Sequence, residues 1–255
     1  MVTRIITLVL LIGAISLGYV LYSNVKGPVD EKVSIQRTEK QIERKLKYVR
    51  DVQALYLSQN GKYAGKWKDL EDFVLNGTIL NVQQKEVTKL QDDGKEIITI
   101  EYDTLGTVPV KDSLAGQYAD IAPRKMSIIP GTGKQFTLFA GKVDNGGVML
   151  NVYEVRDEYP INPERGAQFN EKGEPYSVTS LIKYFEDKLK TNNEEARKLQ
   201  EKLKKASGEE KKKIEEEINE LSKYINLYGK RIEQLQTKPL RVGSRVEATT
   251  AGNWE

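Results

Sequence analysis

The stretch Ile5-Ile-Thr-Leu-Val-Leu-Leu-Ile-Gly-Ala-Ile-Ser-Leu-Gly-Tyr-Val-Leu-Tyr22 decides how the chain is placed, because its 18 residues include no charged side chain. A helix of this length is about 27 Å long, which is just enough to cross the hydrocarbon core of a bilayer. Two tyrosines lie at its far end, where amphipathic rings favour the membrane interface. We therefore predict a single-pass anchor, with these residues in the membrane: Ile5, Leu8, Leu11, Ile12, Ile15, Tyr19 and Tyr22.

Two other interpretations of this stretch remain open. A cleaved signal peptide also begins with a positive residue, here Arg4, and the core helix of a soluble domain can be equally apolar. The apolar region of a signal peptide is usually shorter, and no clean small-x-small cleavage site precedes Lys26. An uncleaved anchor is therefore the main prediction.

The orientation of the anchor is a separate question. One basic residue precedes the span, whereas Lys26, Lys32, Arg37 and Lys40 follow it, and the positive-inside rule would place that basic side in the cytoplasm. Large domains, however, translocate largely regardless of charge. An anchor this close to the start usually leaves the bulk of the chain outside, so we expect a bacterial inner-membrane protein with its C-terminal domain in the periplasm.

The composition excludes several classes of function. The chain has 255 residues, with 40 Lys and Arg against 37 Asp and Glu, and this balance gives no field that would attract nucleic acid. It contains no histidine and no cysteine, which excludes Ser-His and Cys-His catalysis, zinc held by imidazole or thiolate, and attached c-type haem. We expect no enzyme, no cofactor and no metal site. Acid–base chemistry by lysine or tyrosine stays open, and carboxylate pairs such as Asp157-Glu158 lie at turns or strand ends.

A break and a second helix are expected after the anchor. Lys26-Gly27-Pro28 predicts the break, because proline lacks an N–H and disfavours a helical residue before it. Residues 1–29 would then be anchor and linker. An apolar residue recurs every seven positions at Ile35, Ile42, Val49 and Tyr56, which predicts an amphipathic helix from Glu31 to Ser58.

Residues 30–176 are expected to form an α+β body. A short helical pattern covers residues 67–74, and alternating apolar residues predict strands at 96–102, 125–129, 135–139 and 148–155. Asp92-Asp93-Gly94, Gly131-Thr-Gly133 and Asp144-Asn145-Gly146-Gly147 lie between these runs and have the composition of hairpin turns. The body would therefore be a small antiparallel sheet packed on the long helix.

Residues 177–238 have a heptad pattern that predicts an antiparallel coiled-coil hairpin. The pattern slips at Ser207, Gly208, Glu209 and Glu210, which we take as the hairpin tip, with Ser207 and Glu210 as a capping box. When the segment is folded there, Leu203 meets Ile214, Ala196 meets Leu221, and each further pair keeps the same index sum. The predicted seam comprises Ile182, Phe185, Leu189, Asn192, Leu199, Leu203, Ile214, Ile218, Leu221, Ile225, Tyr228, Ile232 and Leu235, with Ala196 among them.

Residues 239–255 are expected to return to the body. Leu240 to Ala248 alternates like a strand, and Pro239 marks the exit from the hairpin. Because the two ends of a hairpin lie together, the body can continue through it. The hairpin would then be an inserted, projecting arm.

Two resemblances concern the N-terminal region and the body. The apolar start, the long helix ending in Tyr56-Leu-Ser-Gln-Asn-Gly-Lys-Tyr63 and the sheet that follows resemble type IV pilins and pseudopilins. The chain is also similar to a group of uncharacterised single-pass bacterial membrane proteins in Leu55-Tyr-Leu-Ser-Gln-Asn-Gly-Lys-Tyr-Ala64, in Leu70-Glu-Asp-Phe-Val74 and in the ending from Leu240-Arg-Val-Gly-Ser244 through Gly252-Asn-Trp-Glu255. These resemblances imply placement in a membrane and a pilin-like body, and no activity.

The expected function is therefore a membrane-anchored structural or scaffolding protein of the bacterial cell envelope, which contacts a protein partner through its arm. The alternative is a transport or secretion adaptor whose hairpin docks on a channel or envelope component. An enzyme or peptidoglycan-binding module would need a deep pocket lined by paired carboxylates. A homo-oligomer formed through the 31–58 helix stays open.

Overall fold

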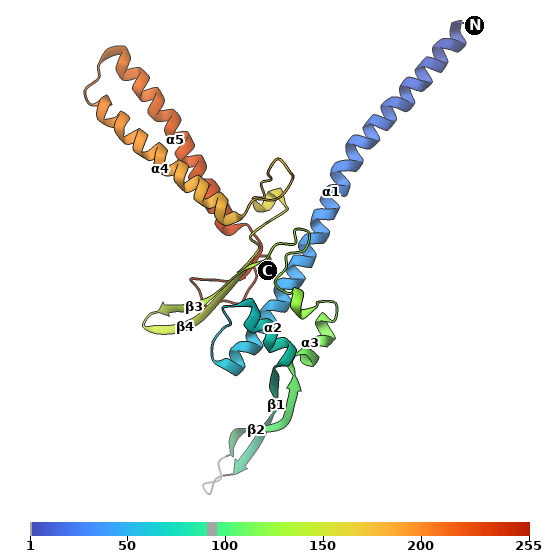
Figure 1. Ribbon diagram of the computed structural model, residues 1–255, viewed down its shortest axis with the longest axis vertical. Helices are drawn as coiled ribbons and strands as arrows, with labels where there is room; N and C mark the ends of the chain where they lie inside the picture. Colours follow the sequence, from blue (N-terminus) through green and yellow to red (C-terminus); the bar gives the residue numbers. More distant parts are fainter. Residues whose placement is uncertain (1, 91–95) are drawn as a thin grey trace.

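The computed structural model describes residues 2–90 and 96–255, and the predicted turn at Asp92–Gly94 lies outside them. Its helices are α1 (Val2–Asn60), α2 (Trp67–Asn76), α3 (Val110–Tyr118), α4 (Val178–Leu203) and α5 (Gly208–Thr237). Its strands are β1 (Thr78–Leu90), β2 (Glu96–Pro109), β3 (Thr137–Asn145), β4 (Val148–Arg156) and β5 (Arg241–Gly243). The predicted combination of helices with small antiparallel sheets is confirmed (Figure 1).

Helix α1 runs unbroken through Pro28, so the predicted break at residues 26–28 is wrong. Proline removes one hydrogen bond, the one to the carbonyl of Asn24, and costs about 3 kcal/mol in a helix interior. Stopping the helix and starting it again needs a new nucleus, which costs about 4 kcal/mol for a nucleation constant near 10⁻³. Continuing through the proline is therefore the less costly course, and anchor and body share one helix.

The core lies where the C-terminal half of α1 meets the rest of the body. One face of α1 is fully covered there, and α2, α3 and the β3–β4–β5 sheet supply the opposing side chains. The main contributors are Ile42, Leu46, Val49, Val52, Leu70, Val74, Val110, Tyr153, Val155 and Val242. The buried amide of Gln53 donates to the carbonyl of Ala64 and accepts from its N–H, both at 2.9 Å, and so fixes the turn after α1.

The sheet differs from the prediction in two ways. Strands β1 and β2 pair only with each other, as a ribbon that projects from the body at the end opposite the N-terminus, while β3, β4 and β5 form a separate antiparallel sheet (Figure 1). The C-terminal segment joins that sheet through only three residues, paired with β4. The predicted alternation at residues 240–248 therefore continues as strand only to Gly243.

The strand predicted at residues 125–129 is wrong. A 3₁₀ turn covers Pro123–Lys125, and only Ile128 forms an isolated bridge, to Gln135. The carbonyls of Lys125 and Ile128 accept from the ammonium group of Lys45 on α1. Proline presets the turn, and a side chain of α1 satisfies the carbonyls that a neighbouring strand would have used.

Candidate interaction arm

The anchor residues lie on a part of α1 that nothing else in the described chain covers. The exposed fractions of Leu11, Ile12, Ile15, Tyr19 and Tyr22 lie between 58% and 71%. The side chains of Ile5 and Leu8 are outside the described set. Among the described residues, this is one helix that is long and apolar enough to cross a membrane, and its apolar window is not buried at all. The alternative of a buried core helix is therefore wrong.

Helices α4 and α5 lie side by side and project from the body as an arm, joined by residues 204–207 (Figure 1). Every residue of the predicted seam is buried or half-buried. Between residues 183 and 233, the other positions are exposed except for Asn193 and Ala206. The seam is closed most tightly at the root, where Val178, Leu181, Phe185 and Leu235 form a small core.

The tip begins as expected but lacks its capping box. Ser207 is the N-cap residue of α5, yet its side chain accepts no hydrogen bond from the helix. Gly208 has φ +64°, a left-handed conformation that glycine adopts freely. A capping box needs helical dihedrals from the first helical residue onward, so this glycine takes the hydroxyl of Ser207 out of the required geometry.

Aromatic side chains form a ladder across one flank of the arm. The ring of Tyr184 contacts Phe185 with centroids 5.3 Å apart, Phe185 contacts Tyr228 at 5.8 Å, and Tyr228 contacts Tyr224 at 6.2 Å. Tyr184 and Tyr224 are 54% and 51% exposed, and Leu227, one helical turn from Tyr224, is 48% exposed. We call Tyr184, Tyr224, Leu227 and Tyr228 the aromatic flank. Exposed aromatic residues of this kind are enriched at protein–protein interfaces.

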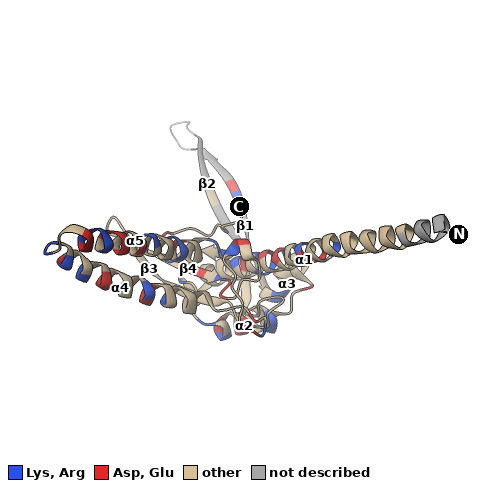
Figure 2. Ribbon diagram, turned by 90° about the horizontal axis from the view of Figure 1, so that it is seen from above, with Lys and Arg blue, Asp and Glu red and all other residues tan. Residues whose placement is uncertain are grey.

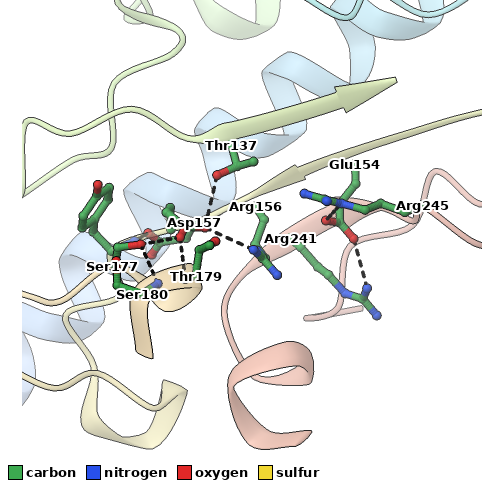
Figure 3. A network of polar contacts seen from close by, with 11 residues as sticks. Thr137, Glu154, Arg156, Asp157, Ser177, Thr179, Ser180, Arg241 and Arg245 are labelled. Atoms are coloured by element: carbon green, nitrogen blue, oxygen red, sulfur yellow. Dashed lines mark hydrogen bonds and ion pairs between the residues drawn. The ribbon is translucent and has the colours of Figure 1, made fainter. Parts of the chain in front are cut away.

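The root of the arm is fixed by Glu158, a carboxylate that follows β4. Figure 3 labels its partners Thr137, Arg156, Ser177 and Thr179. It accepts a hydrogen bond from the Ser177 hydroxyl at 2.6 Å, from the Thr179 N–H at 2.7 Å and from the Thr137 hydroxyl at 3.2 Å, and it pairs with Arg156 at 3.1 Å. Glu158 therefore caps the N-terminus of α4 with a full negative charge. Burial alone would raise the pKa of Glu158, but the hydrogen bonds and the arginine outweigh it and lower that pKa.

The environment of the neighbouring residue Asp157 shifts its carboxyl pKa in the opposite direction. Its side chain is 2% exposed and accepts a hydrogen bond from the Tyr159 N–H at 2.9 Å, while its own N–H donates to Leu240. Burial raises the pKa of Asp157 to about 7; the nearby charges of Glu158 and Glu39 add to this rise, and Arg165 opposes it. Asp157 is therefore a titratable group inside the root of the arm.

Two further contacts connect the root with the anchor helix and the sheet. Arg165 donates to the carboxylate of Glu39 on α1 at 3.0 Å and to the carbonyl of Lys238 at the end of α5 at 3.3 Å. Glu154 on β4 pairs with Arg241 at 3.3 Å and with Arg245 at 2.8 Å (Figure 3). Arg165 thus bridges α1 and the end of α5, and the Glu154 pairs join β4 to the C-terminal segment.

The heptad pattern predicts the seam, but no sequence signal points to this root. Glu39 and Arg165 lie 126 residues apart, and no spacing rule connects them. Asp157-Glu158 was visible only as two adjacent acidic residues at a strand end. Within residues 2–90 and 96–255, no three acidic, histidine or cysteine side chains are grouped so that they could hold a metal ion.

Comparison with known proteins adds no assignment: no protein-family model, no curated protein and no solved structure matches the chain.

Proposed function

We propose that this chain is a membrane-anchored, non-enzymatic scaffold of the bacterial cell envelope, and that its arm binds a protein partner. The observation that carries the proposal is the continuity of α1, which runs from exposed apolar residues into the core of the body without a linker. A body joined to its anchor by one helix keeps a fixed height above the membrane. That property suits a positioning role.

The height can be estimated from the helix itself. If residues 5–22 cross the bilayer, the 17 helical steps from Tyr22 to Glu39 are about 25 Å long. Glu39 is where Arg165 connects the helix to the root of the arm. The root would therefore lie roughly 25 Å from the membrane boundary, measured along α1.

We infer that the arm is an antiparallel coiled coil. The support is the burial of the predicted seam, with exposed residues on both sides of it, and the contact of α4 with α5 over their length. Asn192 is a half-buried polar residue within this seam, and such a residue fixes the register of a coiled coil at some expense of stability.

The aromatic flank is the surface that we assign to the protein partner. Tyrosine supplies a large contact area at low entropic cost, and two exposed tyrosines with a leucine beside them form a compact apolar patch on an otherwise charged arm. The opposite flank carries polar residues such as Asn226, which is exposed. The two flanks of one arm therefore offer a matched comparison.

A site-specific photo-crosslinker tests the partner assignment in living cells. A crosslinking amino acid at Tyr224 or Leu227 should give a discrete larger species, whereas the same group at Asn226 should give none. A channel or secretion component in that species would favour the alternative of an adaptor. Equal crosslinking from both flanks, or none from either, would contradict the assignment.

The periplasmic orientation is part of the proposal and has its own test. The chain has no cysteine, so a single Ser207→Cys substitution places one thiol at the tip. A membrane-impermeant maleimide should label it in intact spheroplasts. Labelling only after lysis would place the body in the cytoplasm, as the basic residues after the span favour.

The resemblance to pilins stays a proposal. Pilins keep the helix continuous beyond the membrane, and α1 does so here through Pro28. The apolar segment contains no acidic residue, although pilins carry one just inside it, so we do not extend the proposal to assembly of a pilus.

A further inference from the structure

Lysines cap the outer end of the arm. Between Leu203 and Ile214, a stretch that includes the turn, the chain carries two glutamates, Glu209 and Glu210, and five lysines: Lys204, Lys205, Lys211, Lys212 and Lys213. The formal charge of this cap is therefore three positive. All five lysines are exposed, and the ion pairs found among the described residues include none of them. Figure 2 shows the basic residues at this end of α4 and α5.

The charge is confined to the tip. The next turns toward the root hold Glu201, Glu215, Glu216, Glu217 and Glu220 against Arg197, Lys198 and Lys202, so they are acidic overall. Lys211, Lys212 and Lys213 stand four residues before Glu215, Glu216 and Glu217, which is the less favourable order for an i,i+4 pair, and the ion pairs found among the described residues include none of these combinations. The charge of these lysines is therefore not neutralised by ion pairs within the helix.

The arm and the uncovered part of α1 leave the body on the same side. In Figure 1 the tip of the arm and the N-terminal end of α1 both point away from the β1–β2 ribbon. The arm therefore extends toward the membrane in which α1 would be anchored.

The length of the arm is sufficient to reach that membrane. Helix α4 has 26 residues and is about 39 Å long. Its root lies about 25 Å from the membrane boundary along α1, as estimated above from Tyr22 and Glu39. An arm of this length covers that height when it is inclined by up to about 50° to the membrane normal, and spans commonly tilt by 0–40°.

We propose that the lysine cap of the arm binds the anionic lipid headgroups of the same membrane that α1 spans. Clusters of four to eight basic residues near a membrane surface bind anionic lipids through such electrostatic attraction. The chain would then hold the membrane at two points, the anchor and the tip, with the body and the aromatic flank between them. The inference rests on the membrane anchor of the proposed function, and not on its protein partner.

The test uses the full-length protein reconstituted in lipid vesicles, with a donor dye on Ser207→Cys and an acceptor on lipid headgroups. Vesicles of phosphatidylcholine are compared with vesicles that contain phosphatidylglycerol in addition. Energy transfer should be higher in the anionic vesicles and should fall as salt is raised from 50 to 500 mM, because the screening length shortens.

Two matched variants decide whether the cap is responsible. The tip variant carries Lys204→Gln, Lys205→Gln, Lys211→Gln and Lys212→Gln, which remove four charges from the tip. The control variant carries Lys183→Gln, Lys190→Gln, Lys223→Gln and Lys230→Gln, which remove four exposed charges from the rest of the arm. Each tip lysine near an anionic surface contributes about a fivefold factor to the docked population. The tip variant should therefore lower the docked-to-free ratio by a hundredfold or more, and the control variant should leave it nearly unchanged.

Three outcomes would overturn the proposal: equal energy transfer in both kinds of vesicle, insensitivity to salt, or equal loss in the two variants. Circular dichroism of each variant shows whether the arm remains helical. A protein that does not float with the vesicles at all would instead contradict the anchor, so failure of the two proposals is distinguishable.

Discussion

Substitution of Asp157 by asparagine should stabilise the folded protein at neutral and alkaline pH. The carboxyl is 2% exposed and keeps its hydrogen bond from the Tyr159 N–H, a bond that the amide oxygen of asparagine can also accept. The ionised form is disfavoured in the fold chiefly because burial removes its hydration, which raises its pKa to about 7. Asparagine has nearly the same shape and no charge.

The magnitude follows from the two pKa values of Asp157. The unfolded chain titrates at the ordinary value of 3.8 and the folded chain at about 7, so the folded state binds more protons between them. The free energy of unfolding of the native protein therefore falls as pH rises through this window, by roughly 1.4 kcal/mol per pH unit. The variant should gain nothing below pH 4 and about 4 kcal/mol above pH 7.

Urea unfolding of the full chain in detergent, followed by circular dichroism at pH 4, 5.5, 7 and 8, measures this difference. Subtracting native from variant at each pH cancels the titration of every other group. A variant that is equally or less stable at pH 8 would refute the reasoning, and so would a difference that does not grow between pH 4 and 7.

Two other substitutions should act in defined ways. Glu158→Gln should destabilise the fold by about 3 kcal/mol at pH 7, because it leaves the half-buried Arg156 beside an uncharged partner. The loss should shrink as pH falls through the lowered pKa of Glu158, a pH dependence that urea unfolding reveals. Leu235 is 2% exposed in the root core, so Leu235→Ala should lower the free energy of unfolding by about 2–4 kcal/mol and speed amide hydrogen exchange in α4 and α5. As its control, Leu227→Ala on the exposed aromatic flank should change the free energy of unfolding by no more than about 0.5 kcal/mol.

The parts of the fold that the sequence predicts well are those with a local periodicity. The apolar run at residues 5–22, the seven-residue repeat from Ile35 to Tyr56 and the heptads of the arm each depend on neighbours within one helix. Residues 67–74 likewise form a helix, α2, and Asn76 and Gly77 end it. In the 35–56 helix, in the arm and in α2, the residues that set the pattern also provide the contacts; the run at residues 5–22 stays uncovered in the described chain.

The predictions fail where contacts with residues distant in the sequence determine the local structure. Alternation at residues 125–129 is compatible with a strand, but Lys45 takes the carbonyls of that segment. Alternation also cannot show whether two strand pairs share one sheet, and the β1–β2 ribbon stands apart from the other three strands. The predicted helix break at Pro28 follows from the local preference of proline alone. A new helix nucleus costs more free energy than one missing hydrogen bond, so the helix continues.

The direction of the arm is the feature that matters most for the proposed role, and it lies beyond any local pattern. A heptad seam defines how α4 meets α5, and it leaves open where the pair points. The direction comes from the root, where Glu158 caps α4, Arg165 joins the end of α5 to Glu39 of α1, and Asp157 bonds to Leu240. Arg165 is the contact among these that bridges α1 and the end of α5, so we expect a change of charge there to alter the direction of the arm relative to α1.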